Sequence, residues 1–275
     1  MKKTAKKTAL GLFRTLLLLI TLVPILWVLI SSLKTQGEML MAPWGVPKTL
    51  MWANYAEAWK RGKFVTLMQN SLAVTGTSLL LMLAFSTMAA FAVSRYRTRY
   101  NGAAMVYLLL GQTISAAMII FPIVLVLRQL NMSDSLPGLI LTYVAGGIPF
   151  ATFVMQGFMA GIPHEIYEAA EIDSAGEVGL FWNIAIPLAK PALATVLLYQ
   201  FMWVWNEFPL AFTLISTTSR RTLIVGLYTV VNGQLQTNYV LAFAGATIVS
   251  VPIIVLYLLF QKYLIQGLVA GAVKG

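Results

Sequence analysis

Long stretches without a charged residue constrain this chain more than any other feature of its sequence. A helix that crosses a bilayer needs about 20 apolar residues. Four uninterrupted runs are of this size: Thr15–Leu33, Leu72–Val93, Ala103–Leu127 and Leu136–Ala160. The sequence therefore predicts an all-α, polytopic membrane protein rather than a globular domain in water.

Two further spans are predicted in the second half of the chain. One starts near Leu188 and continues to about Ile215, interrupted only by Lys190 and Glu207. The other lies in the charge-free stretch 222–261, which polar groups break at Asn232-Gly233-Gln234 and Gln236-Thr237-Asn238. Hydrocarbon does not tolerate such groups, so only Tyr239–Gln261 is expected to span. Thr222–Val231 is expected to be a short helix at the outer surface, and the total is about six spans.

The composition agrees with lipid as the main solvent. Hydrophobic residues make up 59% of the chain and charged residues 10%, whereas a soluble domain carries roughly 25% charged residues. The chain has no cysteine and a single histidine, His164. Disulfides, thiolate chemistry and a cysteine metal site are excluded, and no metal site or bound cofactor is predicted.

The net charge of +10 is explained by orientation rather than by nucleic acid, because the basic residues lie at the edges of the apolar runs. With the N-terminus inside, eleven lysines and arginines fall on the inner side and eight on the outer, five of these in the long loop 34–69. The strongest inner anchor is Arg95-Tyr96-Arg97-Thr98-Arg99. Both termini are predicted to be cytoplasmic. The run Thr15–Leu33 is too long for a cleaved signal and is interpreted as the first span.

The segment between the fourth and fifth spans differs from the rest of the chain. Five of the nine acidic residues lie between Glu165 and Glu177. Pro163 suits the first turn of a helix and Gly176 its end. An acid in the first turn, such as Glu165, complements the helix dipole. The sequence predicts a short helix here.

The faces of this helix suggest a docking surface. At 100° per residue one side carries Ile166, Ala169, Ala170 and Asp173. The two alanines leave room for a partner to approach. Glu168 and Glu171 lie towards the opposite side and are expected to pair with arginine on a docked protein. The competing interpretation is an ordinary solvated loop helix, which these residues alone do not exclude.

A family resemblance distinguishes between these interpretations. The residues Glu168-Ala169-Ala170-x-x-Asp173, followed by Phe181, Ile186-Pro187-Leu188 and Pro191, resemble the "EAA" loop of ATP-binding-cassette importer permeases. Trp205-Asn206-Glu207-Phe208 is similar to a segment of the carbohydrate-uptake branch. The ending 266–275 resembles that of the second permease of maltose, multiple-sugar or glycerol-phosphate importers.

The resemblance implies a type I importer permease with three parts. They are residues 1–68 with the first span and outer loop, a core over 69–265 with the coupling loop 161–187, and a cytoplasmic tail over 266–275. The coupling residues it implies are Glu168, Ala169, Ala170, Asp173, Ser174 and Gly176. The family pattern has glycine where this chain has Ser174. A left-handed conformation there is costly for serine, and Gly176 offers an alternative turn two residues later.

The implied partners are a second permease, two ATP-binding subunits, an extracellular solute-binding protein and membrane lipid. ATP and Mg²⁺ are expected on the partner ATPase, since Gly146-Gly147 lacks the lysine of a phosphate loop. The chain is expected not to be an enzyme, and to lie in the cell membrane of a prokaryote. By resemblance, ATP-driven closure of the ATPases moves the coupling helices and opens the pathway outward.

Candidate substrate contacts lie around the one acid inside a span, Glu207. One interpretation places Asn206 and Glu207 on the translocation path, with Trp203 or Trp205 stacking on a sugar. The other has Glu207 satisfying backbone groups or a partner helix near the outer end of the span. Outside the spans, Arg128 and Asp134 are interpreted as a surface pair flanking a short turn.

Three alternatives to a carbohydrate permease remain at this point. One is an importer permease for a solute other than sugar. Another is an ion-coupled secondary transporter, which commonly carries paired acids or histidines in its spans and repeated halves. A membrane-embedded enzyme would need clustered polar groups at one depth. The spans hold one acid, no histidine and no visible repeat, so both of the other classes are disfavoured.

Overall fold

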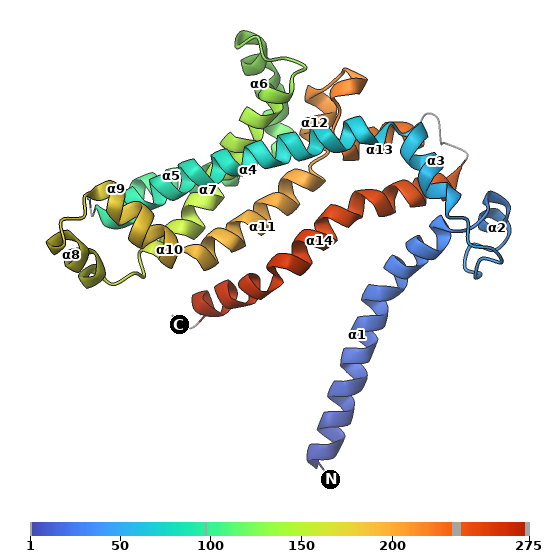
Figure 1. Ribbon diagram of the computed structural model, residues 1–275, viewed down its shortest axis with the longest axis horizontal. Helices are drawn as coiled ribbons and strands as arrows, with labels where there is room; N and C mark the ends of the chain where they lie inside the picture. The colour runs from blue at the N-terminus through green and yellow to red at the C-terminus, as the bar shows by residue number, and fades with distance from the viewer. Residues whose placement is uncertain (1, 97, 233–237, 273–275) are drawn as a thin grey trace. The chain divides into compact units, whose positions relative to one another are not determined.

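The computed structural model describes residues 2–96, 98–232 and 238–272. Three parts of the sequence interpretation fall outside these residues: Arg97, the polar break over 233–237, and the last positions of the tail, 273–275. Within the described residues all regular structure is helical (Figure 1). The all-α prediction is confirmed.

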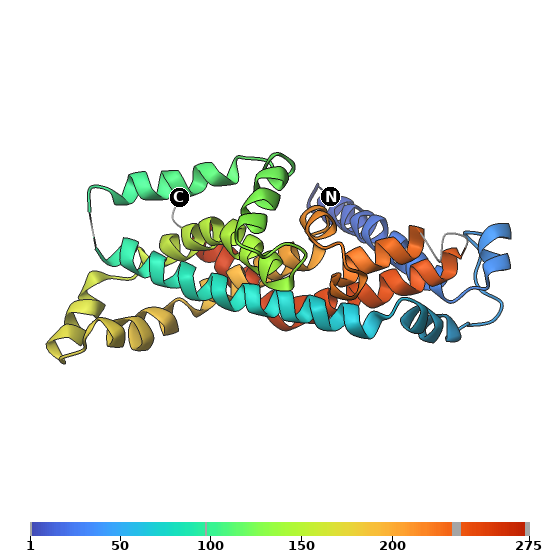
Figure 2. The same ribbon diagram turned by 90° about the horizontal axis from the view of Figure 1, so that it is seen from above.

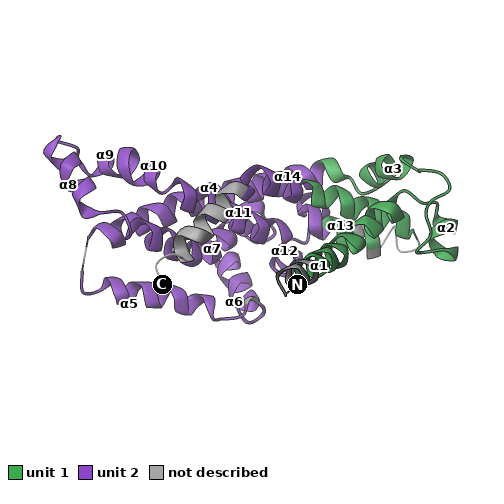
Figure 3. Ribbon diagram, turned by 90° about the horizontal axis from the view of Figure 1, so that it is seen from below, with its two compact units in different colours: residues 1–65, 226–251 green, residues 66–225, 252–275 purple. Residues whose placement is uncertain are grey.

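The helices divide between two compact units, which are described separately (Figure 3). Unit 1 comprises residues 1–65 and 226–251, and unit 2 comprises residues 66–225 and 252–275. Three helices cross the boundary between the units: α4 (Phe64–Arg95), α13 (Leu223–Asn232) and α14 (Tyr239–Ala272).

Unit 1 holds the first helix and the loop that follows it. Its own elements are α1 (Lys2–Ser32), α2 (Gln36–Met41) and α3 (Ala53–Arg61). Thr35 begins α2 with a capping box, in which its hydroxyl accepts from the Glu38 N–H and the Glu38 carboxylate accepts from the Thr35 N–H. The buried Lys34 ammonium donates to the carbonyls of Ala42 and Pro43. These contacts order a loop that carries many exposed apolar side chains.

Unit 2 contains the helices around which the candidate sites are built. The longer ones are α5 (Asn101–Gln112), α6 (Ala116–Gln129), α7 (Leu136–Met159) and α11 (Lys190–Asn206). The shorter ones are α8 (His164–Ile172), α9 (Glu177–Gly179), a π-helix (Leu180–Ala185), α10 (Ile186–Leu188), α12 (Pro209–Leu214) and a 3₁₀ turn (Thr218–Arg220). α7 is central in this unit, because both α5 and α11 pack against it.

Four helices are long and apolar enough to cross a bilayer, and six segments are if each of two bent pairs counts as one span. The four are Leu10–Ser32, Phe64–Arg95, Leu136–Met159 and Tyr239–Gln261. They coincide with the first, second, fourth and last predicted spans, which are confirmed as helices of spanning length. α13 is only 10 residues long, too short to span, as expected for Thr222–Val231.

The third predicted span is wrong as a single straight helix. Asn101–Gln112 and Ala117–Gln129 form a pair bent by 101° (Figure 2). At the junction Ser115 has an extended backbone, φ −61° and ψ 136°, which ends the helical path. An apolar run gives no sign of such a bend, because residues on both sides of it are equally apolar.

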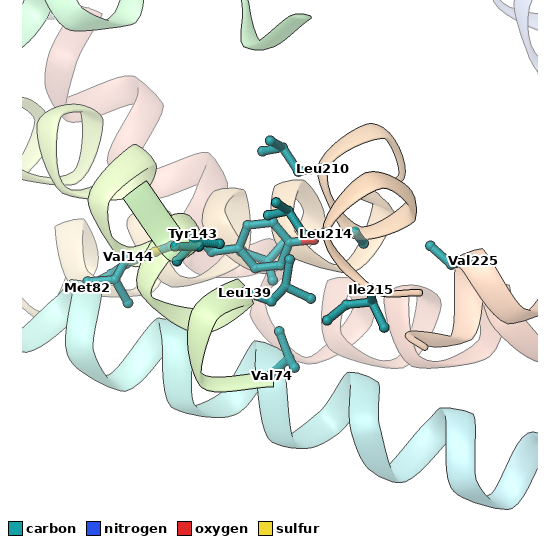
Figure 4. Close-up of a cluster of buried hydrophobic side chains, with 12 residues drawn as sticks. Val74, Met82, Leu139, Tyr143, Val144, Leu210, Leu214, Ile215 and Val225 are labelled. Atoms are coloured by element: carbon teal, nitrogen blue, oxygen red, sulfur yellow. The ribbon is translucent and has the colours of Figure 1, made fainter. Parts of the chain in front are cut away.

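Two apolar clusters hold unit 2 together. The first, here the Tyr143 cluster, is shown in Figure 4 and contains Val74, Met82, Leu127, Leu139, Tyr143, Val144, Val204, Leu210, Ala211, Leu214, Ile215 and Val225. The second, the Tyr167 cluster, contains Ala90, Phe91, Ala151, Met155, Met159, Tyr167, Leu180, Ala185, Ala189, Ala192 and Val196. α4, α7 and α11 contribute to both clusters.

Gly147 of α7 leaves room for the Met82 side chain of α4. A Cβ added at Gly147 would lie 2.5 Å from the Met82 sulfur and 3.3 Å from the Gln200 amide nitrogen. The Gln200 side chain also donates to the Gly147 carbonyl at 2.9 Å. A larger residue at 147 would require the buried Met82 side chain to move.

The predicted pair of Arg128 and Asp134 does not form among the described contacts. Asp134 accepts from the backbone N–H groups of Ser216 and Thr217 and from the Thr217 hydroxyl, and it faces Arg220 at 3.6 Å. The Thr217 hydroxyl, followed by the Thr217 N–H, lowers the pKa of the Asp134 carboxyl below its ordinary value. The partner lies more than 80 residues away in the chain, so local sequence gave no sign of it.

Candidate functional site

The acidic segment folds as the predicted short helix, α8. It begins one residue later than expected: Pro163, with φ −57° and ψ 138°, is the residue before the helix rather than part of its first turn. Glu165 lies in the first turn, where its charge complements the helix dipole. The helix ends at Ile172, with Asp173 as the capping residue.

The prediction that Gly176 ends this helix is wrong. Ser174 takes the left-handed conformation, φ 63°, while Gly176 is extended at φ −73° and ψ 171°. The Ser174 N–H donates to the Glu171 carbonyl at 2.9 Å, and the Ala175 N–H donates to the Ala170 carbonyl at 3.0 Å. These two bonds form a Schellman motif, which fixes the turn at Ser174 in spite of the missing glycine.

α8 is anchored by a residue that the sequence interpretation missed. Tyr167 is only 4% exposed, and Ala170 and Ala175 pack against the same cluster. In contrast, Ile166, Ala169 and Asp173 are all exposed. The spacing of Tyr167 and Ala170, three residues apart, was the available signal for an anchoring face. The stripe that contains Ile166, Ala169 and Asp173 therefore faces away from the chain's own core.

The two acids expected to meet a docked arginine differ in their surroundings. Glu171 forms an ion pair with Arg95 at the end of α4. Its assignment to a partner protein is therefore corrected, because this chain supplies the arginine. Glu168 is exposed, and no ion pair of its carboxylate occurs within the described part of the chain.

The chain leaves α8 through a compact connection. Phe181, in the π-helix, lies edge-on to Phe91 of α4 at 5.3 Å between centroids. Pro187 occupies the start of α10, and Pro191 that of α11. The helical path bends by 73° between Glu177–Leu188 and Lys190–Asn206. The motif prolines thus mark the entry into α11.

The fifth predicted span is broken near its C-terminal end. α11 stops at Asn206, Glu207 is extended at φ −68° and ψ 123°, and α12 starts at Pro209. Pro209 has no backbone N–H to donate into a helix continued from α11. The interpretation of 188–215 as one continuous helix is therefore wrong.

Glu207 satisfies the groups left by this break. Its carboxylate accepts from the backbone N–H groups of Leu210 at 2.8 Å and Ala211 at 3.0 Å. The buried Tyr143 hydroxyl donates to the same carboxylate at 2.7 Å. These are the contacts expected of an acid that caps a helix and pairs with a neighbouring helix.

Trp203 and Trp205 lie in different surroundings. Trp205 is 4% exposed and stacks on Phe201 at 5.3 Å. Trp203 lies edge-on to Tyr143 at 5.7 Å and lines a cavity. The Asn206 amide donates to the Met202 carbonyl at 2.7 Å. Of the four candidate substrate contacts, only Trp203 lines that cavity.

The cavity has a volume of about 590 Å³ and lies among α5, α6, α7, α11 and α12. Aromatic rings line it at Trp203, Tyr199 and Phe150, and the last two stack 4.3 Å apart. Amide and hydroxyl groups are supplied by Gln112, Gln200, Thr142 and Ser115. Its lining includes no charged side chain. Rings with neutral hydrogen-bonding groups suit a neutral polyhydroxylated solute.

Nothing in the described side chains assembles three metal-ligating groups.

Comparison with known proteins gives a consistent result. The family described as "Binding-protein-dependent transport system inner membrane component" matches residues 82–269. The diacetylchitobiose uptake system permease protein of Streptomyces coelicolor is 32% identical over 93% of this chain and 85% of its own length. The melibiose/raffinose/stachyose import permease protein of Bacillus subtilis is 32% identical over 92% and 91%.

A solved structure also matches. A chain of a bacterial ABC transporter involved in the import of the acidic polysaccharide alginate superposes with a TM-score of 0.79 at 26% identity. The match covers 92% of this chain and 94% of that one.

Proposed function

The chain belongs to the family of binding-protein-dependent transport system inner membrane components, and from that premise we propose how it works as a carbohydrate importer. It is a permease subunit of an ABC transporter for carbohydrate, and a multi-pass protein of a prokaryotic cell membrane. As in its relatives, the chain is a transport component and not itself an enzyme. Its substrate class, carbohydrate, is inferred from relatives that import oligosaccharides.

We propose that α8 docks onto the ATPase subunit of the transporter. The observation that carries this proposal is the division of its surface. Tyr167 anchors α8 in the chain's own core, while Ile166, Ala169 and Asp173 remain exposed beside Glu168. The short side chains of Ala169 and Asp173 permit close approach of the ATPase. The carboxylate of Glu168 suits an arginine of that subunit.

The remaining components of the transporter are partner subunits. We propose that ATP and Mg²⁺ bind to two ATPase subunits, that a second permease completes the pathway, and that an extracellular binding protein delivers the sugar. Both termini, α8 and the loop after α4 then lie in the cytoplasm, in agreement with the basic residues Arg95 and Arg99. With each bent pair counted once, the chain has six spans.

The cavity beside Trp203 is proposed as this subunit's part of the pathway. Its stacked and tilted rings offer flat apolar surfaces to a sugar, and its amides and hydroxyls offer hydrogen bonds. Trp205, Asn206 and Glu207 are assigned a supporting role, since each is packed or bonded within the chain. Normal uptake by a Trp203→Ala protein that assembles fully would remove Trp203 from the path.

In the proposed cycle ATP-driven closure of the ATPases moves α8, and the cavity opens outward to receive sugar. Hydrolysis returns the ATPases and α8, so that the cavity opens inward. Both steps require that α8 stays attached to the membrane helices while it moves.

Reversal of the charge at Glu168 tests this proposal most directly. Glu168→Lys should prevent ATPase docking and abolish uptake, because two like charges replace an attractive pair. Membrane insertion should be unchanged, since the side chain is exposed. The measurements are co-purification of the ATPase and uptake of labelled oligosaccharide in the presence of the binding protein.

Glu57→Lys is the matched control, because it makes the same charge change at an exposed surface pair with Arg61 in unit 1. The Glu57→Lys protein should bind the ATPase and transport sugar normally. Normal transport by Glu168→Lys would mean that α8 is not the docking helix.

A further inference from the structure

The end of α4 holds the proposed docking helix through a charged contact. Arg95 is the last residue of α4 and lies 76 residues before its partner Glu171 on α8. The Arg95 side chain is 13% exposed, whereas that of Glu171 is 42% exposed. Such a half-buried pair is less screened by water and salt than a pair at the open surface.

Tyr167 strengthens the same contact. The Arg95 guanidinium lies 5.5 Å from the centre of the Tyr167 ring, within the range of a cation–π interaction. Phe91, one helical turn before Arg95, meets the Tyr167 ring edge-on at 6.3 Å. One end of α4 thus contacts two residues of α8, Tyr167 and Glu171, which lie four positions apart on the helix surface.

The neighbouring residue extends the contact beyond α8. The Tyr96 hydroxyl is hydrogen-bonded to Glu177 at the start of α9, and this bond raises the pKa of Tyr96 above its ordinary value. Phe91 also packs against Phe181 of the π-helix. α4 therefore contacts the loop both before and after the turn at Ser174.

These contacts matter because α8 cannot hold its position alone. It has nine residues, and isolated helices of that length are marginal in water. Its far end is continuous with the path into α11 through the bend at 188–190. Its near side rests on α4. A displacement of α8 is therefore transmitted to α4 as long as these contacts persist.

We propose that Arg95 is a positioning residue for transport, which fastens α8 to α4 through Glu171 and Tyr167 so that both move together. The two acids of α8 then have separate roles: Glu168 faces the partner ATPase, and Glu171 faces the chain's own α4. This inference rests on the proposed docking role of α8, but it concerns the transmission of movement and not the docking itself.

A charge exchange tests this assignment. The variants are Arg95→Glu, Glu171→Arg and the double exchange, with Glu168→Arg as the matched variant at the neighbouring exposed acid of α8. Three quantities are measured in the assembled transporter: co-purification of the ATPase, ATP hydrolysis stimulated by the loaded binding protein, and sugar uptake per ATP hydrolysed.

Each single exchange at 95 or 171 should retain the ATPase and lower uptake per ATP about tenfold, within the range found for residues on a coupling path. The double exchange should recover most of the loss, because the pair is re-formed with reversed charges. Glu168→Arg should instead lose the ATPase, and no change at 95 should restore it.

The outcomes separate the two ideas. If Glu168→Arg keeps the ATPase and transports normally, the docking role of α8 fails. If Glu168→Arg loses the ATPase as expected, but Arg95→Glu transports normally or the double exchange is no better than the single ones, the positioning role of Arg95 fails. Glu171→Gln provides a milder variant that keeps the shape of the side chain. It should lower uptake per ATP, and normal coupling in it would also contradict the proposal.

Discussion

Two buried tyrosines, one in each apolar cluster of unit 2, differ in the hydrogen bonding of their hydroxyl groups. Tyr143 is 1% exposed and its hydroxyl donates to Glu207 at 2.7 Å. Tyr167 is 4% exposed, and its hydroxyl has no hydrogen-bond partner among the described residues. Burial raises the pKa of Tyr167, and the nearby Arg95 offsets part of that rise.

The difference follows from what each tyrosine supports. Tyr143 belongs to a network in which a carboxylate caps the broken end of a helix, so every polar atom is needed. Tyr167 acts through its ring, which lies against Phe91 and under Arg95. The Tyr143 cluster is held by hydrogen bonds. The Tyr167 cluster is held by aromatic and charged contacts at the loop that is proposed to move.

The largest expected effect is the loss of the Glu207 carboxylate. Glu207→Ala leaves the Tyr143 hydroxyl and the N–H groups of Leu210 and Ala211 without their acceptor, at about 1–3 kcal/mol for each buried group. The protein should unfold far below the wild-type temperature or fail to accumulate in the membrane. The measurement is the midpoint of thermal unfolding of the protein purified in detergent.

Glu207→Gln is the milder variant, because its amide oxygen can keep the bonds from Tyr143 and Ala211 at the Oε2 position, while its NH2 group leaves the Leu210 N–H without an acceptor. It should be destabilised less than Glu207→Ala, and the assembled protein should transport sugar at close to the normal rate. If it assembles normally but transports poorly, the charge of Glu207 is needed on the pathway and its supporting role is wrong.

The paired change Tyr→Phe compares the two clusters directly. Tyr143→Phe removes a hydrogen bond to a charged group and should destabilise the protein by about 2 kcal/mol. Tyr167→Phe removes a hydroxyl without a partner and should change stability by less than about 0.5 kcal/mol. The comparison uses unfolding midpoints under identical conditions. Equal losses would show that the Tyr167 hydroxyl has a bond of its own.

An effect smaller than that of Tyr143→Phe is expected at the turn that ends α8. Ser174 is left-handed at φ 63°, a conformation that costs an L-residue about 1–2 kcal/mol. Ser174→Gly should stabilise the loop by about 1 kcal/mol, which can be measured as slower hydrogen exchange of the Ser174 and Ala175 amides. Gly176→Ala is the control and should be nearly neutral, because Gly176 is extended. Slower exchange in Gly176→Ala and not in Ser174→Gly would place the turn at Gly176.

Most of the helices were predictable because spanning a membrane demands length and continuous apolarity. The runs Leu72–Val93, Leu136–Ala160 and Tyr239–Gln261 each correspond to one long helix. The helix α8, proposed to dock, was predictable as a helix from its acidic composition and its motif, though its end was not. Gly176 looked like the better left-handed residue, but two hydrogen bonds from Ser174 and Ala175 fix the turn at the motif position.

The unpredicted side-chain partners share one cause. The groups that meet Glu207, Asp134 and Glu171 lie 64, 82 and 76 residues away in the chain. Hydropathy reports the environment of each residue and does not report which acceptor meets which donor.

The sequence by itself determined that this chain is helical, lies in a membrane and carries a short acidic helix, because composition and local spacing are sufficient for these properties. Only the tertiary structure decided which acids are used internally. Glu207 and Glu171 each find a partner from another helix, Tyr143 and Arg95 respectively. Glu168 finds none among the described ion pairs. A carboxylate's role depends on the hydrogen-bond donors that the fold brings within about 3 Å of it. The spacing of residues in the sequence does not specify which donors these are.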